Sequence, residues 1–182
     1  MLNNEFYASG EQRAGIEAVQ RMQAVKRWHM IDTTRQQTLA EHSANVALLS
    51  WYISHTAPGM FFGSSDAIAS EALRHDLAEV FTGDIPSHSK RHLTGLHELE
   101  AQILPSVYQT PALTDDVQIL VKLCDLADGI RFVRLHGVDV TSEHAAAGLY
   151  KQLDAKLEIA TRWPAPVLHY VTDAVRFYAF TK

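Results

Sequence analysis

The feature that most constrains this chain is an ordered series of potential metal ligands on separate predicted helices. His42 comes first, the adjacent pair His75-Asp76 follows, and Asp125 closes the series. No short loop supplies all four side chains, so a fold that uses them together must bring three helices to one point. A set of two imidazole nitrogens and two carboxylates suits an ion such as Zn, Mn, Fe, Co or Ni. It is less suited to an ion that prefers oxygen ligands alone. The series therefore favours a helical bundle built around a metal ion.

Apolar residues recur at helical spacing along nearly the whole chain, and no stretch of more than a few residues has the period of a strand. Spacing and capping residues predict helices over residues 16–22, 41–55, 67–81, 97–107, 115–135, 143–161 and 167–180. Asp66 is the expected N-cap of the third helix, Pro105 interrupts the fourth, and Ser142 precedes the sixth. The polar segment 86–95 is long for a connection, which suggests that it lies over a site.

Composition excludes several classes of protein. The 182 residues contain no internal repeat or linker, so residues 1–182 are expected to form one compact all-α domain. A net charge of −5 gives no global basic field, and no nucleic acid polymer is expected as a partner. A single cysteine, Cys124, excludes an intrachain disulfide framework. Without a signal peptide or an apolar run of about 18 residues, the expected location is the cytoplasm, in a cell or in a virus-infected cell.

Each candidate ligand also has an alternative interpretation. A lone histidine such as His42 is more often structural than metal-binding, and acidic residues on helices are usually solvated. Asp125 lies at helical spacing from Lys122 and Arg131, so it is a candidate for a simple ion pair on its own helix. Asp128 competes with Asp125 as the last ligand of the series. The joint occurrence of all the motifs in order favours the metal site.

With their flanking residues, these motifs resemble the HD-domain metal phosphohydrolases, and among them the small enzymes that dephosphorylate 2′-deoxynucleotides. The matching stretches are Lys26-Arg27-Trp28, Glu41-His42-Ser43, His75-Asp76 with Glu79, Thr82-Gly83-Asp84-Ile85-Pro86, and Asp125 in Lys122-x-x-Asp125. They cover the first two thirds of the chain, and no motif matches after about residue 133. The resemblance implies an HD-domain helical bundle, one divalent transition-type ion with the option of a second ion on the substrate phosphates, and a homo-oligomer.

The resemblance also implies roles for residues near the ligands. Glu79 is expected to take a proton from the attacking water, and Asp84 is expected either to orient that water or to bind the sugar 3′-hydroxyl. Arg27 offers a forked donor to phosphate oxygens. Trp28 offers a flat surface to a base or a deoxyribose ring.

Four further residues are candidates for substrate contacts. Met30 or Ile31 would exclude a ribose 2′-hydroxyl by packing close to the sugar. Lys90 and Arg91 in the polar segment would neutralise additional phosphates.

Two versions of the activity remain open. One releases phosphate from deoxynucleoside monophosphates, as a 5′-deoxynucleotidase does. The other strips the phosphates from deoxynucleoside triphosphates, notably dATP, and leaves the nucleoside. The short chain and the run Arg35-Gln36-Gln37-Thr38 favour the second version, because they resemble the viral members.

Two other classes of function are less well supported. HD hydrolases of cyclic dinucleotides or guanosine tetraphosphate carry different motifs around their ligands, and the Arg27-Trp28 pair argues against them. A non-catalytic HD scaffold or binding protein would not need an intact ligand series together with Glu79.

Overall fold

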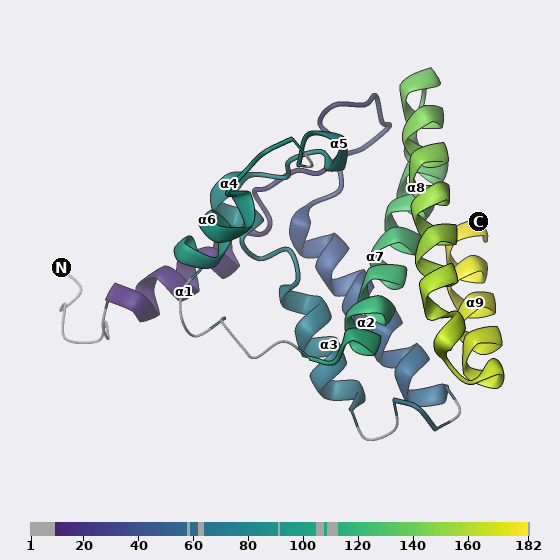
Figure 1. The fold of residues 1–182 in the computed structure, drawn as a ribbon. Helices are drawn as coiled ribbons and strands as arrows, with labels where there is room; N and C mark the ends of the chain where they lie inside the picture. Colours follow the sequence, from purple (N-terminus) through teal and green to yellow (C-terminus); the bar gives the residue numbers. More distant parts are fainter. Residues whose placement is uncertain are drawn as a thin grey trace.

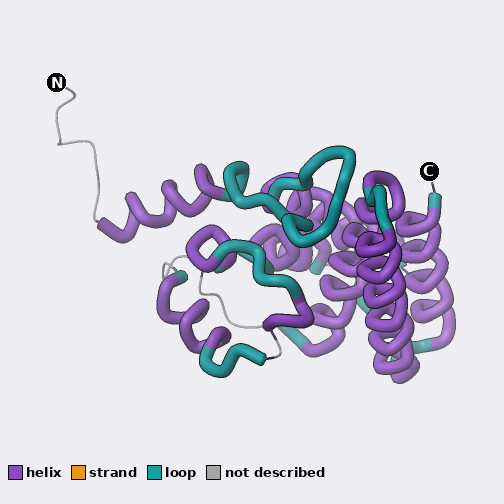
Figure 2. Tube along the Cα trace, turned by 90° about the horizontal axis from the view of Figure 1, so that it is seen from above, coloured by secondary structure: helices purple, strands orange, loops and turns teal. Residues whose placement is uncertain are grey.

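The computed structural model describes residues 10–57, 59–61, 64–90, 92–104, 108 and 113–181. Within these residues the regular elements are helices and no β-strand occurs, which confirms the predicted all-α fold (Figure 2). The α-helices are α1 (Gly10–Arg21), α2 (Leu39–Thr56), α3 (Ser65–Arg74), α4 (Glu79–Thr82), α5 (Ser87–Lys90), α6 (Leu96–Ile103), α7 (Asp115–His136), α8 (Val140–Ile159) and α9 (Ala165–Phe180). A short 3-10 helix, η3 (Ala160–Arg162), joins α8 to α9.

Helix α7 is the centre of the bundle that carries the site. Helices α2 and α3 pack on one side of it, and α8 and α9 cover the other side (Figure 1). Nearly every residue from Val117 to Val133 is buried, as expected of a helix that is surrounded by others. Helix α1 projects away from this bundle and contacts α4 (Figures 1 and 2).

The single helix predicted over residues 67–81 is wrong. Helix α3 ends at Arg74, and α4 begins at Glu79. Between them the backbone tightens to i→i+3 hydrogen bonds, from Leu77 N to Arg74 O and from Glu79 N to Asp76 O, both 2.9 Å. The His75-Asp76 pair therefore lies in a tight turn, where the spacing of a regular α-helix does not set the side-chain directions.

Two predicted helix starts also need correction. Ser64, not Asp66, precedes the first turn of α3, and the Asp66 carboxylate instead accepts a hydrogen bond from Trp51 Nε1 at 2.9 Å. Helix α8 is capped by Asp139, whose carboxylate accepts a hydrogen bond from Ser142 N at 3.1 Å. A carboxylate is a good N-cap acceptor, so the helix begins earlier than predicted. The interruption predicted at Pro105 lies outside the described residues.

Backbone pairing anchors the loop between α1 and α2 at two points. Isolated bridges join Lys26 to Thr38 and Thr33 to Gly137, at the end of α7. Within this loop Trp28 has a φ of +63°, which is uncommon for a residue with a Cβ. Such a conformation persists only where the surrounding contacts fix it. The loop is therefore a rigid support for the Arg27-Trp28 pair.

No described helix combines the length and hydrophobicity that a bilayer span requires.

The packing of α7 predicts a large effect for Leu120→Ala. Leu120 is fully buried, and removing it leaves a cavity that should lower the free energy of unfolding by about 2–5 kcal/mol. The matched control is Leu48→Ala, because Leu48 is 69% exposed and the expected change is within about 0.5 kcal/mol. Urea titrations monitored by circular dichroism give both values. Equal changes in the two variants would contradict the central place of α7.

Candidate functional site

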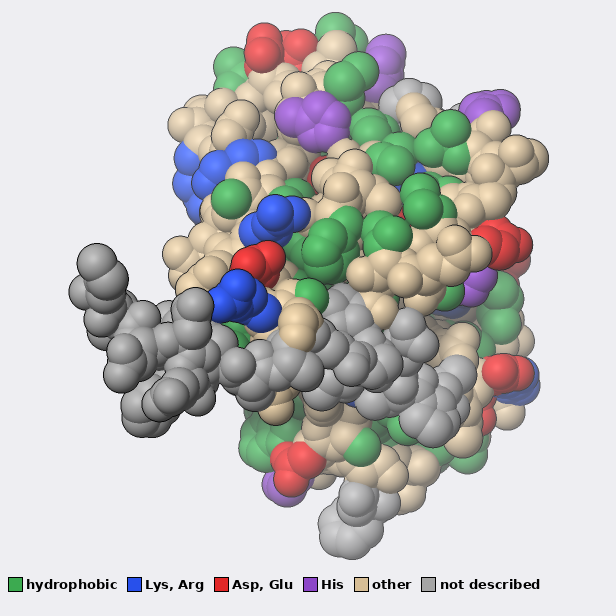
Figure 3. Space-filling model, turned by 90° about the vertical axis from the view of Figure 1, so that its left-hand side faces the viewer, with side chains coloured by type: hydrophobic (Ala, Val, Ile, Leu, Met, Phe, Trp, Pro, Cys, Tyr) green, Lys and Arg blue, Asp and Glu red, His purple; other side chains and the backbone are tan. Residues whose placement is uncertain are grey.

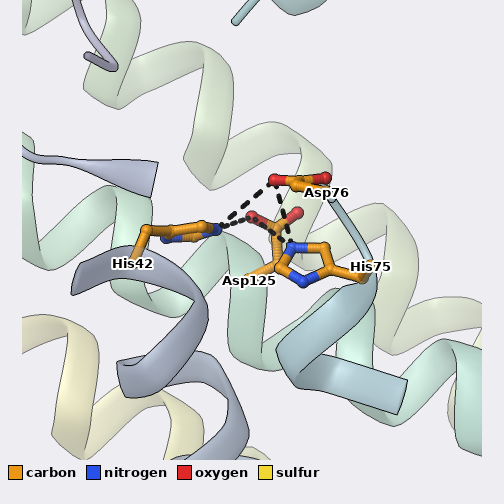
Figure 4. Close-up of side chains that lie close together, drawn as sticks. All are labelled: His42, His75, Asp76 and Asp125. Atoms are coloured by element: carbon orange, nitrogen blue, oxygen red, sulfur yellow. Dashed lines mark ion pairs between the residues drawn. The ribbon is translucent and has the colours of Figure 1, made fainter. Parts of the chain in front are cut away.

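Four side chains from three segments of the chain converge on one point (Figure 4). His42 comes from α2, His75 and Asp76 from the turn after α3, and Asp125 from α7. One potential ligand atom from each residue lies within 4.8 Å of the other three. The His42 and His75 ring centres are 5.4 Å apart. The ligand series of the sequence is thus a single cluster in the fold.

The two imidazoles present nitrogens that require a partner. Nε2 of His42 and Nε2 of His75 are buried, and neither makes a hydrogen bond within the described part of the chain. A buried polar atom without a partner costs about 1–3 kcal/mol, so such atoms need an explanation. His42 Nε2 lies 3.1 Å from Asp125 Oδ1, and His75 Nε2 lies 3.2 Å from Asp76 Oδ2. A divalent cation between these atoms would satisfy all four groups, so the residues fit a metal ion.

The second ring nitrogen of each histidine is held by another group. His42 Nδ1 donates to Asp128 Oδ2 at 2.7 Å, and His75 Nδ1 donates to the carbonyl oxygen of Ala72 at 2.6 Å. Partners of this kind fix the ring orientation and leave Nε2 facing a metal. Asp125, rather than its competitor Asp128, contributes the carboxylate that lies among the potential ligand atoms.

Charges around the cluster keep its carboxylates ionised. Burial alone would raise the pKa of Asp76, but His75 and Arg27 lower it below the ordinary value. Burial likewise opposes ionisation of Asp125, and Lys122 and the histidines lower the pKa of that carboxyl group. Burial would lower the pKa of His75, yet Asp76 and Asp125 raise it to about 9. Without a metal, His75 therefore carries a proton at neutral pH.

Arg27 lies directly against the cluster. Its guanidinium donates to Asp76 Oδ2 at 2.8 Å and lies 3.9 Å from Asp125 Oδ1. Burial would lower the pKa of Arg27, but the two carboxylates raise it above the ordinary value. Arg27, which is predicted to donate hydrogen bonds to phosphate oxygens, is thus paired with the carboxylate of Asp76, a potential metal ligand. It also borders the position expected for a phosphate.

Glu79 begins α4 and is almost completely buried. Its Oε1 accepts a hydrogen bond from Lys90 at 2.5 Å, whereas Oε2 has no hydrogen-bond partner among the described residues. Burial and the charge of Asp76 raise the pKa of Glu79 to about 7, although Lys90 opposes the shift. A carboxylate with this pKa is suited to accept a proton at neutral pH.

A cleft of about 830 Å³ adjoins the cluster. Most of the predicted substrate residues line it: Arg27, Trp28, Met30, Ile31, Asp84 and Lys90. Arg91 lies outside the described residues. The polar segment contributes Pro86 and Lys90 to the wall, as expected of a segment that lies over a site.

The opposite wall of the cleft was missed by the sequence analysis. It comes from one face of α8 and consists of Thr141, His144, Ala145, Gly148, Leu149 and Gln152. No recognised motif extends beyond residue 133, and these residues differ little from an ordinary solvated helix face. The sequence does contain one indication of this wall: His144, Gly148 and Gln152 are four residues apart and therefore lie on one face of a helix.

Figure 3 shows one face of the molecule, on which basic, acidic and apolar side chains are interspersed. The described part of this face carries no extended basic field, in agreement with the net charge of −5. The cations nearest the cluster are instead Arg27, Lys90 and Lys122, each paired with a carboxylate. Positive charge is therefore placed locally, which suits a small anionic ligand better than a polymer.

The pKa of His75 predicts that metal binding releases a proton. Below about pH 9 the imidazole of the metal-free protein is protonated, and an ion must displace that proton to use Nε2. The affinity for a divalent ion should therefore fall as the pH is lowered from 9 to 6. Calorimetry at pH 7.5 in buffers of different ionisation enthalpy should detect about one or more protons released per ion. An affinity that does not change with pH would contradict this account.

The sequence of this chain is similar to the sequences of several known proteins. The sequence model described as 5′-deoxynucleotidase YfbR-like matches residues 16–110. A dATP triphosphohydrolase of cyanophage S-2L is 33% identical over 148 residues, which cover 78% of this chain and 83% of the relative. A dATP triphosphohydrolase of Salmonella phage PMBT28 is 31% identical over 153 residues, with 79% and 78% covered.

A solved structure agrees with these matches. It is the cyanophage S-2L HD phosphohydrolase bound to dA and one catalytic Zn²⁺ ion, which superposes with a TM-score of 0.74 at 28% sequence identity. The superposition covers 88% of this chain and 93% of that chain. The converging ligands, the helical fold and the sequence matches agree, and this chain belongs to the YfbR-like family of HD phosphohydrolases.

Proposed function

We propose that this chain is a divalent-metal-dependent hydrolase of 2′-deoxynucleotides that converts dATP to deoxyadenosine. One observation carries the proposal: four potential ligand atoms within 4.8 Å of one another adjoin a cleft that also contains Glu79. The cleft is large enough for a nucleotide, since sites for small molecules usually measure about 300–1,000 Å³. The similarity to two phage proteins named dATP triphosphohydrolase supports the proposal that dATP is the substrate.

The ligand set would hold one divalent ion, which supplies Lewis acidity toward a phosphoryl oxygen and lowers the pKa of bound water. His42, His75, Asp76 and Asp125 are the proposed ligands. Zinc is the proposed ion, because nitrogen and carboxylate donors suit it and the related structure contains it. A second ion on the substrate phosphates is compatible with the size of the cleft.

Glu79 is the proposed base. Its unpaired Oε2 accepts a proton from the attacking water, whose oxygen forms a bond to the α-phosphorus. The bond between that phosphorus and O5′ breaks, and Glu79 returns the proton to O5′ of the leaving deoxyadenosine. Triphosphate is the second product. Lys90 holds the other oxygen of Glu79 and thereby orients the carboxylate.

Basic side chains of the cleft are proposed to bind the phosphates. Arg27 is placed to share its guanidinium between Asp76 and a phosphate oxygen, because a planar fork of five donors serves two anions at once. Lys90 and, by its position in the sequence, Arg91 are proposed for the outer phosphates.

The sugar and base are proposed to lie along the Trp28 side of the cleft. Trp28 offers a face for stacking, and Met30 or Ile31 would exclude a 2′-hydroxyl by close packing. Asp84 is proposed either to bind the 3′-hydroxyl or to orient the water. These assignments complete the set of substrate contacts that the sequence predicts.

A 5′-deoxynucleotidase acting on monophosphates is the second candidate, and the match to the YfbR-like sequence model favours it. The site chemistry would be the same, since the α-phosphorus of dAMP occupies the same position. We further propose that residues 1–182 act as one HD domain in the cytoplasm, where deoxynucleotides occur. Exposed Phe177 and Phe180 on α9 are proposed to join copies in a homo-oligomer.

A substrate panel tests the proposed function. The purified zinc-loaded protein should convert dATP to deoxyadenosine and intact triphosphate, and it should act on ATP at least about tenfold more slowly, as expected for one clashing hydroxyl. Liquid chromatography separates triphosphate from orthophosphate and nucleoside from nucleotide. Turnover of dAMP without turnover of dATP would establish the monophosphate alternative. Equal turnover of dATP and ATP would refute the deoxyribose selectivity.

The role of Glu79 is tested by Glu79→Gln. The amide cannot accept a proton, so kcat should fall by about 10²–10⁴-fold. Zinc content should remain that of the wild type, because Glu79 is not among the four proposed ligands. Glu98→Gln, at a solvated position of α6, is the matched control and should retain activity. A Glu79→Gln variant with full activity would rule out the proposed base.

A further inference from the structure

Two buried side chains connect the nucleoside platform to the metal cluster. The indole Nε1 of Trp28 donates to Gln37 Oε1 at 2.9 Å. Gln37 Nε2 donates to Asp128 Oδ2 at 2.7 Å, and the same oxygen accepts from His42 Nδ1 at 2.7 Å. Every link in this chain is a hydrogen bond of good length. Trp28 and His42 are therefore joined through Gln37 and Asp128 without water.

Asp128 is fixed from four directions. Besides Gln37 and His42, it accepts hydrogen bonds at Oδ1 from Asn45 at 3.0 Å and from Tyr178 at 2.9 Å. The donors come from α2, from α9 and from the loop before α2. A carboxylate with four donors has little freedom to rotate, so a displacement of one donor is passed to the others.

Gln37 is buried, with an exposed fraction of 1%, and uses both ends of its amide. Its carbonyl oxygen faces Trp28 and its amino group faces Asp128. Asp128 can act only as an acceptor while ionised, and the indole only as a donor. The amide must therefore point in one direction, and no apolar side chain of the same size can replace it.

The Trp28 ring is also held by packing contacts, apart from its indole N–H. It stacks on Phe132 with ring centres 6.2 Å apart and planes 8° from parallel. A Cβ atom at Gly129 would lie 3.3 Å from Trp28 Cζ2, so the ring packs against the bare backbone of α7. A ring confined in this way moves chiefly together with its hydrogen-bond partner Gln37.

We propose that Gln37 and Asp128 form a positioning relay that couples the Trp28 ring to the orientation of His42. Stacking of a nucleoside on Trp28 and metal binding at His42 then favour each other, because each fixes the same hydrogen-bonded chain. Gln37 and Asp128 are positioning residues, since neither lines the cleft or lies among the ligand atoms. This inference rests on the proposed function, in which Trp28 contacts the nucleoside.

The test uses 2′,5′-dideoxyadenosine, which lacks both phosphate and 5′-hydroxyl and so cannot bind the ion through either group. Zinc affinity is measured by competition with a chromophoric chelator, with and without the saturating nucleoside. In the wild type, the nucleoside should tighten zinc binding by about fivefold. In Gln37→Met, which keeps the length but removes both hydrogen bonds, the effect should be less than twofold.

Asn45→Ala is the matched control. It also removes one donor from Asp128, but within the described residues Asn45 makes no hydrogen bond to Trp28 or Gln37, so its loss leaves the Trp28–Gln37–Asp128 hydrogen bonds complete. Zinc binding to this variant should weaken while the effect of the nucleoside remains. Coupling of wild-type strength in Gln37→Met, or equal loss of coupling in both variants, would overturn the relay.

A measurement on the wild type serves if Gln37→Met does not fold. Zinc added without nucleoside should shift the indole N–H resonance of Trp28 in a ¹H–¹⁵N spectrum, because the series of hydrogen bonds that begins at this N–H ends at His42. The indole N–H groups of Trp51 and Trp163 bond to Asp66 and Asp116 and should not shift. An unshifted Trp28 signal would overturn the relay. If the wild type bound no zinc at all, the proposed function would fail together with the relay.

Discussion

The structure depends on holding two carboxylates, one buried and one half-buried, and two imidazoles at one point. Like charges at such short distances repel, and burial penalises each ionised group, so the cluster needs compensating charge. Arg27 and Lys122 supply part of that charge through ion pairs with Asp76 and Asp125. A divalent cation would replace the proton of His75 and would bind the two imidazole nitrogens that have no hydrogen-bond partner among the described residues. Helices α2, α3 and α7 bring the four side chains of the cluster together.

Helix α7 meets the requirement by supplying groups to two layers of the site. Asp125 faces the ligand cluster, and Asp128, three residues later, faces the back of His42. Gly129 follows and lets the Trp28 ring approach the helix backbone. One buried helix thus positions the ligands, their support and the proposed nucleoside platform. Most residues between positions 117 and 133 of this helix are buried, and α2, α3, α8 and α9 pack against it.

The loop from α1 to α2 lies between the ligand cluster and the cleft. It carries Arg27 and Trp28 at one end and Gln37 at the other, and backbone pairing between Lys26 and Thr38 brings these ends together. The positive φ of Trp28 is the local cost of presenting both side chains to the cleft.

Much of the fold and of the ligand cluster was accessible from the sequence. Helical periodicity predicted α2, α7 and α9 closely, because apolar spacing records which face of a helix is buried. The order of His42, His75-Asp76 and Asp125, with its flanking motifs, predicted their convergence. Both signals consist of residue types and their spacing along the chain, which the sequence shows directly.

Tertiary structure alone decided the remaining features. The break between α3 and α4 arises at residues whose helical propensity is ordinary, so packing rather than local preference sets it. The position of Asp128 behind His42, the bridging amide of Gln37 and the α8 wall of the cleft depend on contacts between segments far apart in the chain. A buried hydrogen bond requires two partners at one distance and angle, and a linear sequence does not encode that pairing by residue type or spacing. The sequence by itself therefore determined the helices and the chemistry of the ligands, whereas the folded bundle decided their supports and the shape of the cleft.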